Sequence, residues 1–221
     1  MARDFEEANS NQIRFNALSS PTSKFSLSHW IKFESFTGSH MEQIFSLGKD
    51  ADSTRVLFQW GWHPTPRFIV KWTGDGGTAH EWNHGITLST ATWYHMLIEV
   101  DWSTNPDTVN FWIDGVSKTM TNNLGGDNTT TPDSDATQVI ALGFEAANSG
   151  GNFLDGNLAE VAYWSDNGGA ARAAMLSLGY SPLFIPNNLA FYTPLIGKGG
   201  IAFDAASNSG EQTSTSSVTY S

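Results

Sequence analysis

The chain has 221 residues and a formal net charge of −11, and its length suits one large domain with a substantial core. It has no cysteine, which excludes disulfides and thiolate metal sites, and its 11 basic residues form no stripe of the kind that binds nucleic acid. No apolar run approaches the roughly 20 residues of a membrane span, and residues 1–10 lack the apolar core of a secretion signal.

Short segments of alternating apolar and polar residues follow one another along the chain, separated by loops rich in Gly, Asn, Asp, Ser and Thr. In residues 25–33 the alternation places Phe25, Leu27, Ile31 and Phe33 on one face, which is the pattern of a strand. The same interpretation holds for residues 11–16, 41–48, 55–62, 67–72, 91–102, 109–114, 116–120, 138–144 and 157–164. Many short strands with frequent turns predict an all-β sandwich or jelly roll of two antiparallel sheets.

The strongest local signal lies in residues 93–116. Residues 93–102 alternate like a half-buried strand, with Met96 on one face and Glu99 on the other, solvated face. A second alternating run ends in Asp114-Gly115. This dipeptide predicts a type I′ hairpin turn, because that turn needs positive φ at both central residues.

One short helix is predicted just before Pro182, which blocks its continuation. Gly179 stands where a C-terminal cap belongs. Apolar residues recur with the helical spacing i, i+3, i+4, i+7 at Ala171, Ala174, Met175 and Leu178. A helix of this length needs tertiary packing to be stable. Residues 121–137 are polar and predict a loop at a rim.

Residues 80–84 spell H-E-x-x-H, which binds zinc when it lies on a helix. Glycines flank the motif, so we predict a strand instead. In a strand His80 and His84 share a face but lie roughly 13 Å apart. One zinc ion cannot bridge that distance, so we expect no zinc site and no metalloprotease activity.

The pair Glu99 and Asp101 is similar to the start of the E-x-D-x-E strand of concanavalin A-like β-glucanases. The third position is Ser103, so the pair lacks the spaced partner that glycoside hydrolysis needs. The simpler interpretation is two solvated acids on an outer face. We therefore assign no catalytic residue and expect no enzymatic activity.

Two groups of residues are candidate ligand sites. Four of the nine tryptophans lie in adjacent predicted strands: Trp60, Trp62, Trp72 and Trp82. On an exposed face they would form a glycan platform or a protein interface, and on an inner face they would be core. The acidic pairs at 50–52 and 133–135 are candidate Ca²⁺ ligands or turn initiators, and no other cofactor is expected.

Several of these segments together resemble laminin-G-like domains of the concanavalin A-like superfamily. The resemblance rests on four segments: FSLSHWIKFESF with Trp30, TWYHMLIEVDW, VNFWIDGV, and GNLAEVAYWSDNGG with Glu160 at an acidic position common in the family. The resemblance implies a single domain over residues 1–221 with the concanavalin A-like jelly-roll fold. Residues 189–210 resemble the strand that usually opens such domains, which implies that this strand is permuted to the C-terminus.

The helix followed by GYSPLFIPNNLAFYTPLIG is similar in layout to laminin-G-like proteins of tailed bacteriophages. That resemblance implies a non-enzymatic virion protein, made in the host cytoplasm, that decorates a capsid or forms part of a tail or fibre. Its expected partners are capsid or tail proteins, in a homo-oligomer or symmetric array, without nucleic acid or membrane. The alternative is a carbohydrate-binding lectin module, and the third hypothesis is a glycoside hydrolase.

Overall fold

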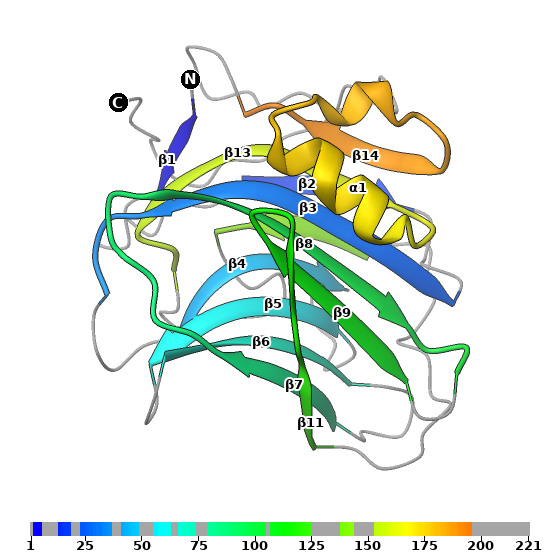
Figure 1. Ribbon diagram of the computed structural model, residues 1–221, viewed down its shortest axis with the longest axis horizontal. Coiled ribbons are helices and arrows are strands. Elements are labelled where there is room, and N and C mark those ends of the chain that lie inside the picture. The colour runs from blue at the N-terminus through cyan, green and yellow to red at the C-terminus, as the bar shows by residue number, and fades with distance from the viewer. Residues whose placement is uncertain are drawn as a thin grey trace.

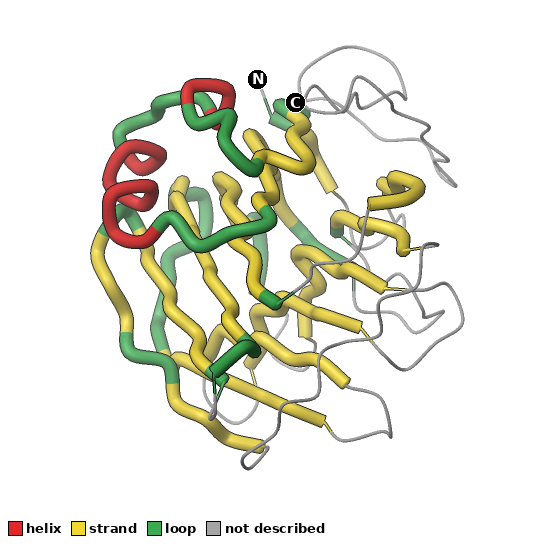
Figure 2. Tube along the Cα trace, turned by 90° about the vertical axis from the view of Figure 1, so that its right-hand side faces the viewer, coloured by secondary structure: helices red, strands yellow, loops and turns green. Residues whose placement is uncertain are grey.

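The computed structural model describes residues 2–5, 13–18, 23–36, 41–48, 55–62, 66–73, 79–104, 107–124, 138–143 and 153–195. Within these ranges the strands form two antiparallel sheets packed face to face (Figure 1). One helix and one short 3₁₀ turn lie together on the outer side of one sheet, as Figure 2 shows from a second direction. The predicted all-β sandwich with one short helix is confirmed.

The sheet beneath the helix, called here the helix-side sheet, follows the order β1, β13, β3, β8, β9, β10, with β14 also paired to β13. Its strands are β1 (Arg3–Phe5), β3 (Lys24–Phe33), β8 (Trp93–Asp101), β9 (Thr108–Ile113), β10 (Val116–Lys118), β13 (Gly156–Trp164) and β14 (Leu189–Thr193). β1 pairs with the first half of β13 and β14 with its second half, so both occupy the edge of β13 that β3 leaves free.

The second sheet follows the order β11, β7, β6, β5, β4, β12, β2. Its strands are β2 (Ile13–Leu18), β4 (Met41–Gly48), β5 (Arg55–Trp62), β6 (Pro66–Thr73), β7 (Ala79–Gly85), β11 (Thr121–Leu124) and β12 (Gln138–Leu142). Residues 80–84 therefore lie on a strand, as their glycine flanks predicted.

Aromatic rings fill the space between the two sheets. Phe111 of β9 packs edge-on against Phe58 and Phe68 of the second sheet, at centroid distances of 5.9 and 5.2 Å. At another part of the same core Phe25 contacts Trp102 and Tyr163. The predicted inner face of residues 25–33 is confirmed, because all four of its apolar side chains belong to this core.

The hairpin between β9 and β10 turns at Asp114-Gly115, where φ is +50° and +76°. Both angles are positive, which confirms the predicted turn. A Cβ on Gly115 would lie 2.7 Å from Oγ of Ser177, so glycine is needed for close packing as well as for its φ. The turn therefore lies directly against the end of the helix α1 (Gly169–Ser177).

Two strands were missed by the sequence analysis, and one prediction was partly wrong. Neither β1 nor β11 shows apolar alternation. β1 consists of Arg, Asp and Phe, and β11 consists of Thr, Asn, Asn and Leu. β11 nevertheless pairs with β7, so residues 121–124 are strand and not rim loop. The strand predicted at the start of residues 189–210 is confirmed as β14, and residues 196–210 lie outside the described ranges, so the permutation stays a prediction.

Candidate functional site

The helix α1 covers part of the outer face of the helix-side sheet, but not with the face that the sequence predicted. Its buried residues are Arg172, Ala173 and Leu176. Ala173 packs on Leu97 and Trp112, so the outer side of β8 is buried as well as the inner side. The stripe at Ala171, Ala174, Met175 and Leu178 is exposed instead. The prediction of a half-buried β8 was therefore wrong, because a helix covers its second face.

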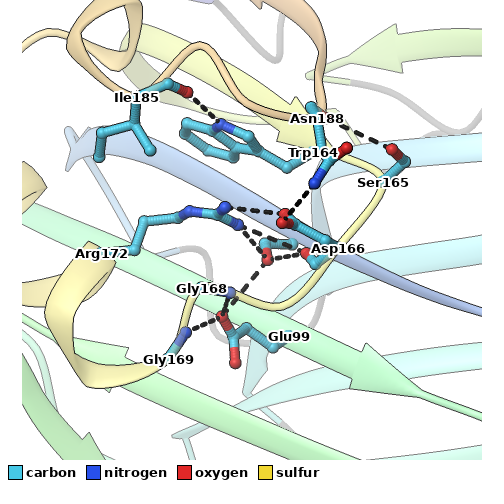
Figure 3. Close-up of polar contacts among 10 residues, drawn as sticks. Glu99, Trp164, Ser165, Asp166, Gly168, Gly169, Arg172, Ile185 and Asn188 are labelled. Carbon is cyan, nitrogen blue, oxygen red and sulfur yellow. Dashed lines mark hydrogen bonds and ion pairs between the residues drawn. The ribbon is translucent and has the colours of Figure 1, made fainter.

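Glu99 is the residue on β8 that holds the start of this helix. Its side chain is only 2% exposed, which corrects the prediction of a solvated acid. Oε1 accepts hydrogen bonds from the backbone N–H groups of Gly168 and Gly169, both at 2.7 Å (Figure 3). A carboxylate at a helix N-terminus satisfies unpaired N–H groups and complements the helix dipole.

Arg172 forms a second anchor beside Glu99. Its guanidinium donates to Oδ1 of Asp166 at 2.7 Å (Figure 3). It also donates to Oγ of Ser26 at 2.8 Å. It also lies over the ring of Trp164, 4.5 Å from the centroid. Pairing of the two terminal guanidinium nitrogens offsets much of the cost of burying this charge, although Nε is buried without a hydrogen-bond partner. The network fixes α1 to the sheet by directed polar contacts.

The chain after α1 is held by Trp164 and Asp166, at the end of β13. Trp164 donates its Nε1–H to the carbonyl oxygen of Ile185 at 2.9 Å, just past the 3₁₀ turn η2 (Pro182–Phe184). Asn188 donates to Oδ2 of Asp166 at 2.8 Å. These contacts connect α1, η2 and β14 to the end of β13 (Figure 3).

Glu160 lies at an irregular point of β13, where its φ is +51° and the pairing with β3 shifts register. Its Oε2 accepts a hydrogen bond from the Tyr192 hydroxyl of β14 at 2.5 Å. Burial raises the pKa of Tyr192 above its usual range, and this hydrogen bond to Glu160 raises it further. The acidic position of the family resemblance is therefore used here to join two strands.

Beyond α1 the outer face of the helix-side sheet keeps accessible aromatic surface. Trp93 is 38% exposed, and Trp30 is half-buried against the ring of His95 at 5.3 Å. Lys32 lies directly opposite Trp93 in the sheet, with Nζ 5.8 Å from the indole centroid. We call Trp30, Lys32 and Trp93 the aromatic patch. Trp30 was singled out by the family resemblance, whereas Trp93 was missed as a candidate because its strand was interpreted only as a fold signal.

His80 and His84 share the inner face of β7, as the strand prediction required. His84 approaches the ring of Phe111, whereas His80 stacks on Trp72 at 5.2 Å. Nδ1 of His80 lies 3.3 Å from Oδ2 of Asp107, and both side chains are buried. Burial lowers the pKa of His80 and raises the pKa of Asp107 to about 6. The H-E-x-x-H histidines thus face two different environments.

The four candidate tryptophans do not form one surface. Trp72 is fully buried and belongs to the core, so its ring cannot act as a platform, and Trp82 is half-buried against that core. Trp60 and Trp62 lie on β5 opposite Phe68 and Pro66, and their side chains lie outside what is described. The structure therefore removes Trp72 from the candidates.

A second exposed surface follows the helix. Its residues, called here the helix ridge, are Met175, Leu178, Tyr180, Leu183 and Phe184. They lie on the last turn of α1, in the turn after it and on η2. In the described part of the chain, this is where most of the exposed large apolar side chains are found.

Metal sites and membrane spans were also sought in the described residues. Within them no group of three or more His, Cys, Asp or Glu side chains is placed to hold a metal ion. The acidic pairs at 50–52 and 133–135 lie outside the described ranges. No helix of the described part is long and apolar enough to cross a membrane.

Comparison with protein families identifies the superfamily to which this fold belongs. The sequence matches the concanavalin A-like lectin/glucanases superfamily over residues 7–172, and the chain belongs to this superfamily. A search among curated proteins finds no match. The family match ends inside α1, so the whole helix ridge and all of β14 lie beyond it.

Three solved structures illustrate the likeness in fold. A candidate carbohydrate-binding protein from Bacteroides ovatus has a TM-score of 0.65 and 21% identity, covering 99% of this chain and 58% of that one. The enzymatically active domain of tailspike protein 2 from bacteriophage CBA120 has a TM-score of 0.63 and 14% identity, covering 87% and 29%. A carbohydrate-binding module of a Ruminococcus gnavus sialidase, bound to α2,3-sialyllactose, has a TM-score of 0.56 and 8% identity, covering 80% and 98%.

Proposed function

We propose that this member of the concanavalin A-like lectin/glucanase superfamily is a carbohydrate-binding module without catalytic activity. The observation that carries the proposal is the aromatic patch, which α1 leaves accessible on the helix-side sheet. The names of the Bacteroides and Ruminococcus structures support it, because both refer to carbohydrate binding. This proposal favours the lectin alternative over the virion protein that the sequence suggested first.

The chemistry of the aromatic patch suits a sugar. The C–H groups of a pyranose ring carry partial positive charge and pack against the negative face of an indole, which Trp93 offers at the surface. Lys32 supplies an ammonium donor beside that ring for a sugar hydroxyl or carboxylate. A flat aromatic surface with one charged donor is a typical combination in ligand sites.

The absence of catalysis is proposed from the contacts that Glu99 and Asp101, the glucanase-like acid pair, make in the structure. Glu99 is buried and already accepts two backbone hydrogen bonds at the start of α1. Asp101 accepts hydrogen bonds from the backbone and hydroxyl of Ser103. Glycoside hydrolysis needs two carboxyl groups that converge on the substrate. Both acids of the motif are instead engaged in local structure.

The direct test is glycan-array binding followed by calorimetry on any glycan retained. Trp93→Ala should weaken binding at least about tenfold, and Trp30→Ala should act in the same direction. Tyr180→Ala is the control, because it removes a more exposed aromatic ring, 52% against 38% for Trp93, from the helix ridge and should leave the affinity for the glycan unchanged. Failure to bind any glycan would contradict the function. Loss of binding in Trp60→Ala or Trp62→Ala, but not in Trp93→Ala, would move the site to β5.

The second candidate is a structural virion protein that docks to phage capsid or tail proteins. The observation in its favour is the likeness in fold to the CBA120 tailspike domain across 87% of this chain. Purified native particles should then contain this chain in a fixed number of copies. Particles that lack the chain, together with measurable glycan affinity, would decide for the lectin module.

A further inference from the structure

The helix ridge exposes more apolar side chain than a soluble surface usually leaves in one place. Leu178 is 78% exposed and Phe184 71%, with Tyr180 at 52%, Leu183 at 51% and Met175 at 37%. Together these side chains present on the order of 500 Å² of apolar surface, a size at which a patch on a monomer is often functional. The ridge therefore requires an explanation other than the scattered exposure of single residues.

The outward face of α1 extends this surface. Ala170, Ala171 and Ala174 are exposed and lie on the side of the helix opposite Arg172 and Ala173. The helix is thus apolar on both sides, and a helix with apolar residues all around is normally buried. Its exposed stripe is the same i, i+3, i+4, i+7 pattern that predicted a packing face from the sequence. The sheet covers the other side of the helix, and among the described residues this pattern stays exposed.

The ridge is rigid enough to serve as a preformed interface. Glu99 and Arg172 fix the start of α1, and Trp164 fixes the chain just after η2 through the Ile185 carbonyl. The rings of Tyr180 and Phe184 meet edge to face, with centroids 6.3 Å apart. Little conformational entropy is then lost when the ridge binds a partner.

The distribution of charge indicates which partner fits. The chain carries a formal net charge of −11, yet no residue between Arg172 and Lys198 is charged. Two copies that met through most other surfaces would bring acidic groups together, which costs association energy. Two copies that met through the ridge would bury no charge. Small alanines along α1 also allow two helices to approach closely, within the usual 8–10 Å between axes.

From these observations we infer that the helix ridge is a two-fold interface that binds a second copy of this chain. The contact is isologous, with α1 packed against α1 and the rings of Tyr180 and Phe184 on either side. A stable interface buries about 800 Å² per partner, so the ridge needs the neighbouring alanines and the Pro186–Asn187 turn to complete it. The inference is independent of glycan binding, because the ridge and the aromatic patch share no residue.

The first experiment measures the association state of the full chain by sedimentation equilibrium across the micromolar range. The wild-type chain should be a dimer. Leu178→Asp places two like charges at the interface and should raise the dissociation constant at least about thirtyfold. Val116→Asp is the matched control, because Val116 is 59% exposed on β10 and lies outside the ridge, so this variant should dimerise like the wild type.

The second experiment uses the absence of cysteine to locate the contact without disturbing the fold. Ala174→Cys lies on the exposed face of α1 and should form an intermolecular disulfide under mild oxidation, because a two-fold axis brings the two thiols together. Val116→Cys should not cross-link under the same conditions. A monomeric wild-type chain, a dimer that survives Leu178→Asp, or a dimer that Ala174→Cys does not cross-link would each overturn the inference.

Discussion

Strand β8 takes part in two buried regions that are built in different ways. On its inner side Met96, Ile98 and Val100 pack among aromatic rings, in contacts that have no preferred direction. On its outer side Leu97 packs in a small cluster with Ala173 of the helix, and Glu99 binds the first N–H groups of α1. The inner region tolerates apolar side chains of similar volume. The outer region depends on particular donors and acceptors.

The difference explains why the two regions were not equally visible in the sequence. Apolar alternation predicts the inner region directly, because the side chains of a strand alternate between its two faces. The outer region contains one short apolar helix with an arginine inside it, and its polar partners come from three separate segments. Substitutions in the two regions should therefore differ in their effect on the free energy of unfolding, and four of them test this difference.

The largest loss is expected in the inner region. Phe111→Ala removes a fully buried ring that contacts Phe58 and Phe68, and should lower the free energy of unfolding by about 3–5 kcal/mol. Urea denaturation followed by tryptophan fluorescence measures this. Val116→Ala is the exposed control and should change stability by no more than about 0.5 kcal/mol. Equal losses for both variants would contradict the assigned core.

A smaller loss is expected in the outer region. Glu99→Ala leaves the N–H groups of Gly168 and Gly169 without their acceptor and should cost about 2–3 kcal/mol. Hydrogen exchange should increase mainly in α1, because the helix loses its anchor. Glu99→Gln keeps an acceptor oxygen and should cost less. If Glu99→Ala abolished a glycosidase activity without altering stability, the residue would instead be catalytic.

A third change tests a polar group placed inside the apolar region. His29 is fully buried beside Phe58, and neither of its ring nitrogens has a hydrogen-bond partner. Burial lowers the pKa of His29 to about 3, and burial lowers the pKa of His95 to about 4. Below pH 6.5 the unfolded chain therefore binds protons that the folded chain does not. Stability that is present above this pH should be lost as the pH falls toward 4.

Replacing this histidine should reverse part of that loss. His29→Phe should raise the free energy of unfolding by about 1–2 kcal/mol at pH 7 and flatten its decline toward pH 4. Asp107 acts in the opposite direction, because its pKa is raised to about 6 and its contribution to stability increases as the pH falls. The measurement is therefore the difference between the wild-type and variant curves. A parallel pair of curves would mean that His29 does not titrate as described.

The smallest effect is expected where the two regions meet at the β9–β10 turn. Gly115→Ala places a Cβ against Ser177 at a positive φ and should cost about 1 kcal/mol. Ser177→Ala should recover the part of that cost that comes from the close contact, but not the part that comes from the backbone. Thermal denaturation of both single variants and the double variant separates the two contributions. Complete recovery would show that backbone strain is negligible.

The sequence by itself determined the sandwich, its main strands, the Asp114-Gly115 turn and the existence of one helix. These features follow from local rules: alternation, positive φ at a turn, and helical spacing ended by Gly179 and Pro182. It also correctly placed the H-E-x-x-H residues on a strand. Such features need no knowledge of which distant segments meet.

Only the tertiary structure decided which surface each of these elements presents. Trp72 became core because β6 faces the other sheet, and Glu99 became buried because α1 lies across β8. The packing face of α1 was set by Arg172, whose partners Ser26 and Asp166 are brought together by β3 and the end of β13. A local pattern specifies the period of an element, whereas its burial depends on contacts between residues far apart in the chain.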